Sequence, residues 1–160
     1  METAEPVVFV ASPAFWAQKY AECEKNGTVK WSTKTVGQEE ISVRQITLDQ
    51  ILQEPFFLTE KHANYRQALD QHLASCRCCL SPVLEISDTA FIIQMLEQSR
   101  GLSFLPLFAV QKQIWEGTLA AVEVDDVEIS MYRQIFYHKN KFRTREMEQF
   151  IIFASEEENH

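Results

Sequence analysis

The sequence predicts an α/β fold in which a mainly parallel sheet is flanked by helices. The first observation is a unit of strand followed by helix that occurs three times, beginning at residues 56–58 (FFL), 83–86 (VLEI) and 102–105 (LSFL). Strands that alternate with helices of about 10–15 residues are typical of βαβ units around a parallel sheet. The second observation is composition, because 46% hydrophobic residues in a chain of 160 is too apolar for disorder and sufficient for one domain or two small lobes.

The N-terminal part begins with a strand and then loses its pattern. The apolar run VVFV at 7–10 predicts a strand, closed by a Ser-Pro pair. From Phe15 to Glu40 polar and charged residues dominate, so we expect a short helix followed by a long loop. The aromatic residues expected to be partly buried under that loop are Trp16, Tyr20 and Trp31.

Each of the three repeats contributes an amphipathic helix. Ahead of the first repeat, Thr47 is predicted to cap a brief helix, LDQIL. In each later helix the apolar residues recur at the spacing that places them on one face, which is expected to cover the sheet, and the last two helices are expected to end near Gly101 and Gly117. The inward residues are Tyr65, Ala68, Leu69 and Leu73 in the first helix, Phe91, Ile92, Met95 and Leu96 in the second, and Val110, Ile114 and Trp115 in the third.

The C-terminal part predicts one more strand, at 131–138, and a final helix from about Thr144. The apolar residues of this helix are not confined to one face, so it is expected to pack against partners on more than one side. They are Met147, Phe150, Ile151 and Ala154 on one face, with Ile152 and Phe153 off that face.

Charge excludes one class of function for this chain. It has 15 Lys and Arg against 23 Asp and Glu, a formal net charge of -8, whereas a nucleic-acid surface needs clustered basic residues. No stretch approaches the about 20 apolar residues that span a bilayer, and the N-terminus lacks the basic region of a signal peptide. We therefore expect a cytoplasmic protein without membrane contact.

Three of the four cysteines cluster at Cys76, Cys78 and Cys79. They form no regular disulfide framework and no complete zinc knuckle, because structural zinc requires four ligands at characteristic spacings. Free thiols at a helix end are the favoured interpretation. A metal or redox site, with His62 or His72 as a helper, is the alternative.

Catalytic motifs are scarce. The sequence has no Gly-x-Ser-x-Gly elbow, phosphate loop, dinucleotide fingerprint or His-Glu-x-x-His helix, and its four glycines leave little room for a phosphate cradle. His62 beside Glu60 is a candidate base, although a lone exposed histidine is usually only solvated. We expect no enzyme, no cofactor and no metal ion.

Two segments carry candidate ligand-binding residues. In an open α/β sheet, ligands bind beyond the carboxyl ends of the strands, where helix N-termini present free N–H groups and positive dipole ends. Residues 59–66 and 87–89 have this position and polar side chains. Ordinary helix capping explains them about as well as capping combined with ligand contact. The candidates are Thr59, Glu60, Asn64, Tyr65, Ser87, Asp88 and Thr89.

The ordered series of segments resembles the effector-binding region of LysR-type transcriptional regulators. The resemblance rests on FFLTEKHANYRQALDQHLA, VLEISDTAFIIQMLEQSRGLSFLP, EGTLAAVEV and YRQIFYHKNKF in that order, preceded by VVFVASPAF. It runs in register over most of residues 5–155, apart from 18–42, which resembles an insertion.

The resemblance implies a periplasmic-binding-protein-like fold of type 2, in which two α/β lobes are joined by two crossover strands and bind an effector between them. The crossover strands are expected at Val7–Ala11 and Arg133–His138. The implied division is 1–11 as a crossover strand and remnant of lobe one, 12–130 as the complete effector-binding lobe two, and 131–160 as the second crossover strand and C-terminal helix of lobe one.

The family's effector contacts match Thr59 with its loop and residues 87–89. The resemblance also implies that the DNA-binding helix-turn-helix and the first elements of lobe one lie outside this chain, so that DNA is reached only through the missing part. A homo-oligomer, a dimer or tetramer in the parent, is implied as well. Without the rest of lobe one, the final helix is expected to pair with a second chain through residues 131–155 in a non-native dimer.

The expected function is therefore the sensing of a small-molecule metabolite in a bacterial regulator, with lobe rearrangement passed to the DNA-binding part. Lys61 and Arg66 would favour an anionic effector, whereas Asp88 would disfavour one at its own helix. The effector itself stays open. The alternatives are a solute-binding protein of the same fold and a small redox protein that uses the clustered cysteines.

Overall fold

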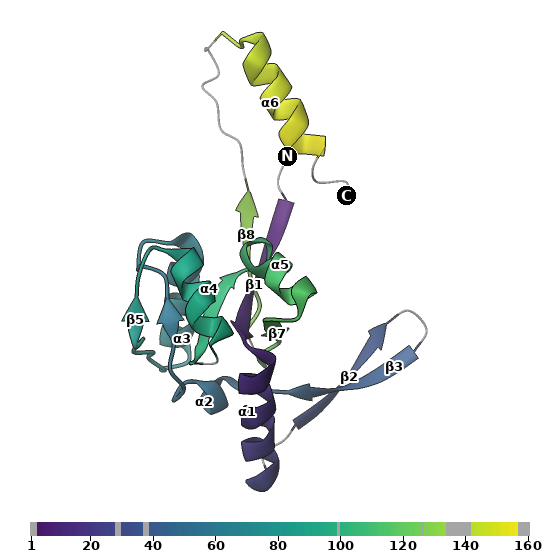
Figure 1. The fold of residues 1–160 in the computed structure, drawn as a ribbon, viewed down its shortest axis with the longest axis vertical. Coiled ribbons are helices and arrows are strands. Elements are labelled where there is room, and N and C mark those ends of the chain that lie inside the picture. The colour runs from purple at the N-terminus through teal and green to yellow at the C-terminus, as the bar shows by residue number, and fades with distance from the viewer. Residues whose placement is uncertain are drawn as a thin grey trace.

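Strand β1 (Thr3–Ala11) runs through the centre of the molecule, and the other strands of its sheet pair with it (Figure 1). Its side chains alternate between the two faces, because Val7, Phe9 and Ala11 belong to one cluster of core residues and Val10 belongs to the other. This period of two is the geometry of a strand that is covered on both faces. The computed structural model describes residues 3–27, 30–36, 39–98, 100–125, 127–133 and 142–156.

Strands and helices alternate along most of the chain, as the sequence predicts. In the described part of the chain, none of the helices is long and apolar enough to cross a membrane. The strands that follow β1 are β2 (Lys30–Val36), β3 (Glu39–Gln45), β4 (Phe57–Leu58), β5 (Leu84–Glu85), β6 (Leu102–Pro106), β7 (Ala120–Val122) and β8 (Ile129–Arg133). The helices are α1 (Pro13–Lys25), α2 (Leu48–Ile51), α3 (Asn64–Ser75), α4 (Thr89–Glu97), α5 (Leu107–Glu116) and α6 (Arg145–Glu156).

Apart from the antiparallel pair β2 and β3, the strands after the first share one direction. β6, β7 and β8 all pair antiparallel with β1, so they run parallel to one another. β4 pairs parallel with β5, and an isolated parallel bridge from Phe56 to Leu102 joins β4 to the edge of β6. The predicted α/β class is confirmed, and the strands of the three repeats are parallel. The departure is β1, which lies antiparallel among them and makes the sheet mixed.

Helices cover both faces of this sheet. On one face Trp16 of α1 and Leu69 and Leu73 of α3 pack with Phe9 and Phe104, whose ring centroids are 4.7 Å apart. On the other face α4 and α5 pack on β1 and β6 through Ile92, Leu96 and Val110. Full burial of each large apolar side chain contributes about 1.5–3 kcal/mol. The predicted faces of the three helices meet the sheet through these buried residues. The predicted inward positions of Phe91 and Trp115 are wrong, because their side chains are 42% and 82% exposed.

Capping residues set several helix ends. α1 follows Ser12, whose Oγ accepts a hydrogen bond from the Phe15 N–H at 3.1 Å. α5 ends at Gly117, whose φ of 76° is the left-handed conformation that glycine adopts without steric cost. α4 ends at Glu97, before the predicted Gly101.

The prediction of a long loop within residues 18–42 is wrong. α1 extends to Lys25, and β2 and β3 then form a hairpin whose register pairs Lys30 with Gln45 and Val36 with Glu39. Both strands contain β-branched residues, which favour a β-sheet. The charged residues among them hide the alternation of apolar and polar residues that predicts a strand. Figure 1 shows the hairpin projecting from the rest of the molecule.

Two of the three aromatic residues expected under that loop can be placed. Trp16 is 3% exposed within the core, where its Nε1 donates a hydrogen bond to the Ala120 carbonyl at 2.9 Å. It is therefore a core residue, and its predicted position under a loop is wrong. Tyr20 is partly buried against the same core cluster. The Trp31 side chain lies outside the described part of the structure.

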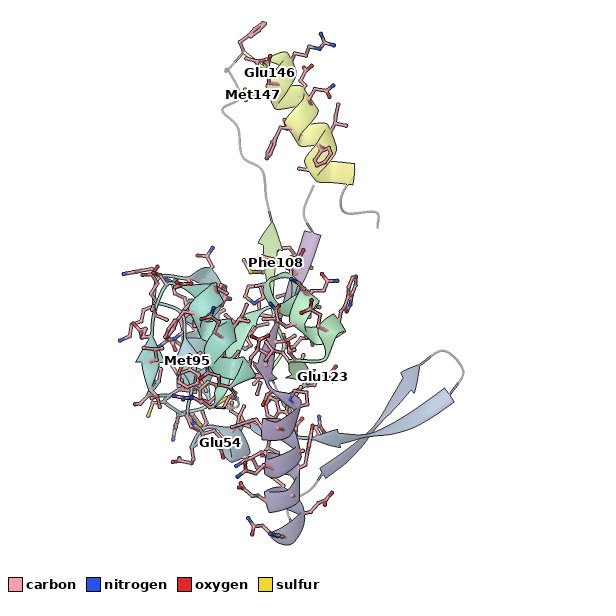
Figure 2. All side chains as sticks on the ribbon, in the orientation of Figure 1. Glu54, Met95, Phe108, Glu123, Glu146 and Met147 are labelled. Carbon is pink, nitrogen blue, oxygen red and sulfur yellow. The ribbon has the colours of Figure 1, made fainter. Side chains whose placement is uncertain are left out.

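A two-stranded ribbon leads away from the sheet toward the C-terminal helix. Residues 3–7 of β1 pair with residues 129–133 of β8, so the ribbon includes an earlier part of β1 than the expected crossover Val7–Ala11, which lies between β6 and β7. Residues 134–138 of the other expected crossover are outside the described residues. The final helix is confirmed as α6, and Figure 2 shows it, with Glu146 and Met147, standing away from the sheet.

Candidate ligand-binding site

The carboxyl ends of β4 and β5 lie side by side. Leu58 pairs with Glu85 in the parallel ladder, and the Ile86 N–H donates to the Leu58 carbonyl at 3.0 Å. Residues 59–63 and 86–88, which follow these strands, therefore leave the same edge of the sheet. The fold brings together the starting points of the two segments that were predicted from sequence.

A buried arginine ties this edge together. Arg66 is 3% exposed, and its Nη1 donates to the Thr59 carbonyl at 2.8 Å and to Glu85 Oε2 at 3.2 Å. Its Nε lies 3.1 Å from both carboxylate oxygens of Asp70, one helical turn later. The guanidinium is thus buried and hydrogen-bonded to groups of the protein itself. The expectation that Arg66 attracts an anionic effector is therefore wrong. The Arg-x-x-x-Asp spacing was the available sequence signal, whereas Glu85 lies on another strand.

Thr59 has a buried hydroxyl group that the protein itself does not satisfy. The residue is 4% exposed, and its Oγ1 makes no hydrogen bond among the described residues. A buried polar group without a partner costs about 1–3 kcal/mol, so such groups usually meet water or a ligand. The other buried polar atoms of this kind in the described chain, Ser103 Oγ and Gln113 Oε1, lie within β6 and α5. Only the Thr59 hydroxyl among them directly follows a strand at the candidate edge.

The two helix N-termini at this edge differ. At α4, Asp88 Oδ1 accepts a hydrogen bond from the Phe91 N–H at 3.1 Å, so the capping interpretation is confirmed for Asp88. At α3 the N-cap position is Ala63, and no side chain caps the helix. Asn64, a candidate cap or ligand contact, is the first residue of the helix instead. The first-turn N–H groups of α3 therefore have no side-chain acceptor from the cap.

The remaining predicted residues are placed around these groups. Glu60, Asn64 and Ser87 are exposed, and Thr89 is half-buried. Tyr65 is half-buried and contacts both core clusters. His62, the candidate base, is exposed, and no contact recorded for the described residues joins it to Glu60.

A separate cavity of about 670 Å³ lies beside the ribbon. It has a mixed lining, with apolar residues of β1 and acidic residues of the segment that joins β7 to β8, and Gln45 Nε2 donates to Asp125 Oδ1 at 3.3 Å at its wall. Sequence reasoning did not identify this cavity, and none of the seven candidate residues lines it. The lining residues are Pro6, Val7, Val8, Phe9, Gln45, His72, Val122, Glu123, Val124, Asp125, Val127, Glu128, Ile129 and Ser130.

Metal chemistry has no prepared site in the part of the chain that the structure describes. No group of three or more His, Cys, Asp or Glu side chains there is arranged to hold a metal ion. The clustered cysteines are therefore not a preformed metal centre.

A family model and one curated relative match the chain. The model of the LysR substrate binding domain matches residues 40–158. The HTH-type transcriptional activator CmpR of Synechocystis sp. PCC 6803 is 24% identical over 119 residues, which cover 73% of this chain and 39% of CmpR. The chain thus spans about two fifths of that relative.

Solved structures show the same fold at low identity. The effector binding domain of QuiR in complex with shikimate aligns with a TM-score of 0.63 and 11% identity, over 95% of this chain and 60% of that one. The Synechocystis PCC 6803 CcmR regulatory domain in complex with 2-PG gives 0.59 and 14%, over 96% and 64%. The regulatory domain of HypT from Salmonella typhimurium gives 0.56 and 15%, over 97% and 63%.

Proposed function

Because this chain belongs to the family of LysR substrate-binding domains, the effector-binding regulatory domains of LysR-type transcriptional regulators, we propose that it is the metabolite-sensing part of a bacterial regulator. Its parent binds DNA through a helix-turn-helix that is not in this sequence, works in the cytoplasm and assembles as a homo-oligomer. In this function the chain acts by binding its ligand, without catalysing a reaction. Division of the chain into a lobe at 12–130 and parts of another lobe at 1–11 and 131–160 belongs to the same proposal.

The observation that carries the proposal is the buried, unsatisfied Thr59 hydroxyl in the segment that leads into α3, whose N-terminus has no side-chain cap. A ligand oxygen at this position would accept hydrogen bonds from the Thr59 hydroxyl and from the first N–H groups of α3, and the positive end of the helix dipole would stabilise negative charge there. Arg66 fixes the backbone of the site, because its Nη1 donates a hydrogen bond to the Thr59 carbonyl.

The ligand contacts in this proposal are Thr59, Glu60, Asn64 and Tyr65 at α3, with Ser87, Asp88 and Thr89 at α4. The two helix ends favour different parts of a ligand. The Asp88 carboxylate caps α4 and repels an anion, so a carboxylate or phosphate group belongs at α3 and a hydroxyl or amine group near Asp88. The QuiR and CcmR domains, bound to shikimate and 2-PG, support a small-molecule ligand.

Sensing requires a ligand that binds one arrangement of the lobes better than another. A ligand shifts such an equilibrium only by its differential affinity for the two states. The ribbon of β1 and β8 leads from the sheet toward α6, and is the connection through which we propose that closure on the ligand is passed on.

The test compares two variants that each remove one buried, unsatisfied hydroxyl group. Thr59→Val keeps the side-chain shape, whereas Ser103→Ala makes the matching change inside β6, near its amino-terminal end. Calorimetric titration of the full chain with a panel of small carboxylates, including shikimate and 2-PG, identifies a ligand for the comparison. Thr59→Val should then weaken binding about tenfold, in line with the loss of one hydrogen bond to a charged group, while Ser103→Ala binds like the native chain. Equal affinity of the Thr59→Val and native chains would remove Thr59 from the site.

A further inference from the structure

The cysteines that follow α3 stand in a helix cap with a defined backbone. Cys76 is the C-cap residue, and Arg77 follows it with a φ of 56°. The Cys78 N–H donates to the Leu73 carbonyl at 2.8 Å, and the Arg77 N–H donates to the Ala74 carbonyl at 3.1 Å. These bonds form a Schellman motif, in which glycine is the usual residue at the position of Arg77. The cap therefore fixes the backbone at Cys76 and Cys78, and Cys79 follows directly.

The four cysteines have different environments. Cys76 and Cys79 are exposed, whereas Cys78 is half-buried and packs against the core cluster beneath α3. Cys23 is 6% exposed within α1. Cys78 thus supplies the apolar contact that accompanies this kind of cap. That leaves Cys76 and Cys79 as an accessible pair, separated by two residues.

A histidine stands beside the first of these two thiols. His72 lies one helical turn before Cys76, and its Nε2 is 3.9 Å from the Cys76 Sγ, within hydrogen-bond range for sulfur. The Ser75 Oγ is 3.8 Å from the same sulfur atom. An imidazole in this position can accept the thiol proton when the sulfur attacks an electrophile.

We propose that Cys76 and Cys79 form a reversible disulfide by exchange with a low-molecular-weight disulfide of the glutathione type. The Cys76 sulfur attacks one sulfur of the oxidant, whose S–S bond breaks, and the first small thiolate leaves with the proton relayed by His72. The Cys79 sulfur then attacks the Cys76 sulfur of the mixed disulfide and releases the second small thiol. Two protein thiols are oxidised, and one small disulfide is reduced to two thiols.

The proposal is independent of the proposed ligand, but it concerns the same helix. α3 begins at Asn64, shortly after Thr59, and its C-cap is Cys76. A bridge between Cys76 and Cys79 would fix the end of α3 that lies opposite the candidate site. The spacing allows the Cα separation of about 4.4–6.8 Å that a disulfide requires.

The reduced full chain, incubated with oxidised glutathione and digested without reductant, tests the proposal by mass spectrometry. The expected product is a peptide with Cys76 bridged to Cys79, while Cys23 stays reduced. Cys79→Ser should stop at a glutathione adduct on Cys76, and Cys78→Ala should still form the bridge. A bridge that contains Cys78, or stable separate adducts on the native chain, would overturn the proposal.

The role of His72 has its own readout, the rate of the first exchange step against pH. In His72→Gln the rate at Cys76 should fall on the order of tenfold near neutral pH and return to the native rate in alkaline solution, where solvent removes the proton. The same ratio of rates at every pH would show that His72 acts only on local structure. The rate at Cys79 in the Cys76→Ser chain, which should not respond to His72→Gln, is the internal control.

Discussion

At the scale of single residues, the buried Arg66 guanidinium connects three elements at the candidate site. It reaches the Thr59 carbonyl after β4, Glu85 in β5 and Asp70 in α3. Asp70 and Glu85 keep 41% and 35% of their side-chain surface exposed, so they retain solvation that the arginine lacks. The burial of the guanidinium therefore depends on its hydrogen bonds to all three partners.

Arg66→Leu should lower the free energy of unfolding by about 2–4 kcal/mol, because it removes hydrogen bonds to two carboxylates and a carbonyl together. Urea denaturation measures the loss. Arg100→Leu, at an exposed arginine, is the matched control and should change stability by no more than about 0.5 kcal/mol. Equal effects of the two changes would contradict the account of Arg66.

The sequence predicted that the candidate residues lie where helices follow strands. It did not predict which of them would cap a helix, be buried or lack a hydrogen-bond partner. Thr59, Asp88 and the loops that carry them were predictable because helix starts after strands have a recognisable polar signature. The buried state of Arg66 was not, because it depends on Glu85 arriving from a separate strand. The missing side-chain cap of α3 also escaped prediction, since Asn64 and Thr59 both resemble caps in sequence.

At the scale of elements, a charged pair ties α1 to the segment that follows α2. Lys19 donates a hydrogen bond to Glu54, labelled beside α1 in Figure 2, and their side chains are 13% and 23% exposed. Burial would lower the pKa of Lys19, but the hydrogen bond and negative charge of Glu54 outweigh it and raise the pKa above 10.5. The pair therefore stabilises the fold most while Lys19 is protonated.

The stability difference between the native chain and Glu54→Gln should accordingly depend on pH. Because the pKa of Lys19 is raised on folding, the contribution is complete below the unfolded value of 10.5 and declines as the pH rises through the folded value. Urea denaturation should give a difference of about 1 kcal/mol near pH 8 that shrinks as the pH rises above 10.5. Glu22→Gln, at the more exposed and distant partner, should show a smaller effect. A difference that grows in alkali would contradict the assignment.

The start of β6 depends on close approach between two backbone segments. A Cβ atom added at Gly101 would lie 2.3 Å from the Pro55 carbonyl oxygen and 2.9 Å from the Phe57 ring. Gly101→Ala should therefore cost about 2–3 kcal/mol, as overpacking does. Gly27→Ala, which has open space but a φ of 66°, should cost only about 1 kcal/mol. Thermal unfolding of the two variants gives the comparison, and a smaller loss at Gly101 than at Gly27 would count against the tight contact.

Element types were predictable where one periodicity dominates. The three repeats and α6 combine apolar residues at helical spacing with short apolar strands, and the structure has them where expected. The hairpin of β2 and β3 was missed, because charged residues interrupt the alternation of apolar and polar residues that marks a half-buried strand. The antiparallel direction of β1 has no local signal, since direction depends on the pairing of β1 with distant β6 and β7.

At the scale of the whole molecule, α6 exposes large apolar side chains. Phe150, Ile152 and Phe153 are 65%, 52% and 66% exposed. Covering several such side chains contributes a few kcal/mol at about 25 cal/mol per Å². We therefore propose, as expected from sequence, that this chain associates with a second copy through residues 131–155.

Sedimentation velocity at a series of concentrations tests the proposed association. The native chain should sediment partly as a dimer, and Phe150→Asp combined with Phe153→Asp should leave a monomer. Phe108→Asp is the control, because it changes a phenylalanine that is 50% exposed on α5. A native monomer at all concentrations, with the helical signal of α6 intact, would exclude the interface.

Amide chemical shifts during a titration with small carboxylates show whether the carboxyl edge of β4 and β5 is the sensor site. A bound carboxylate should produce its largest shifts at residues 59–66 and smaller shifts at 87–91, and Thr59→Val should need about tenfold more carboxylate for the same shifts. Largest shifts at residues 122–125 and 127–130, which line the separate cavity, would contradict a sensor site at this edge and place the ligand beside the ribbon.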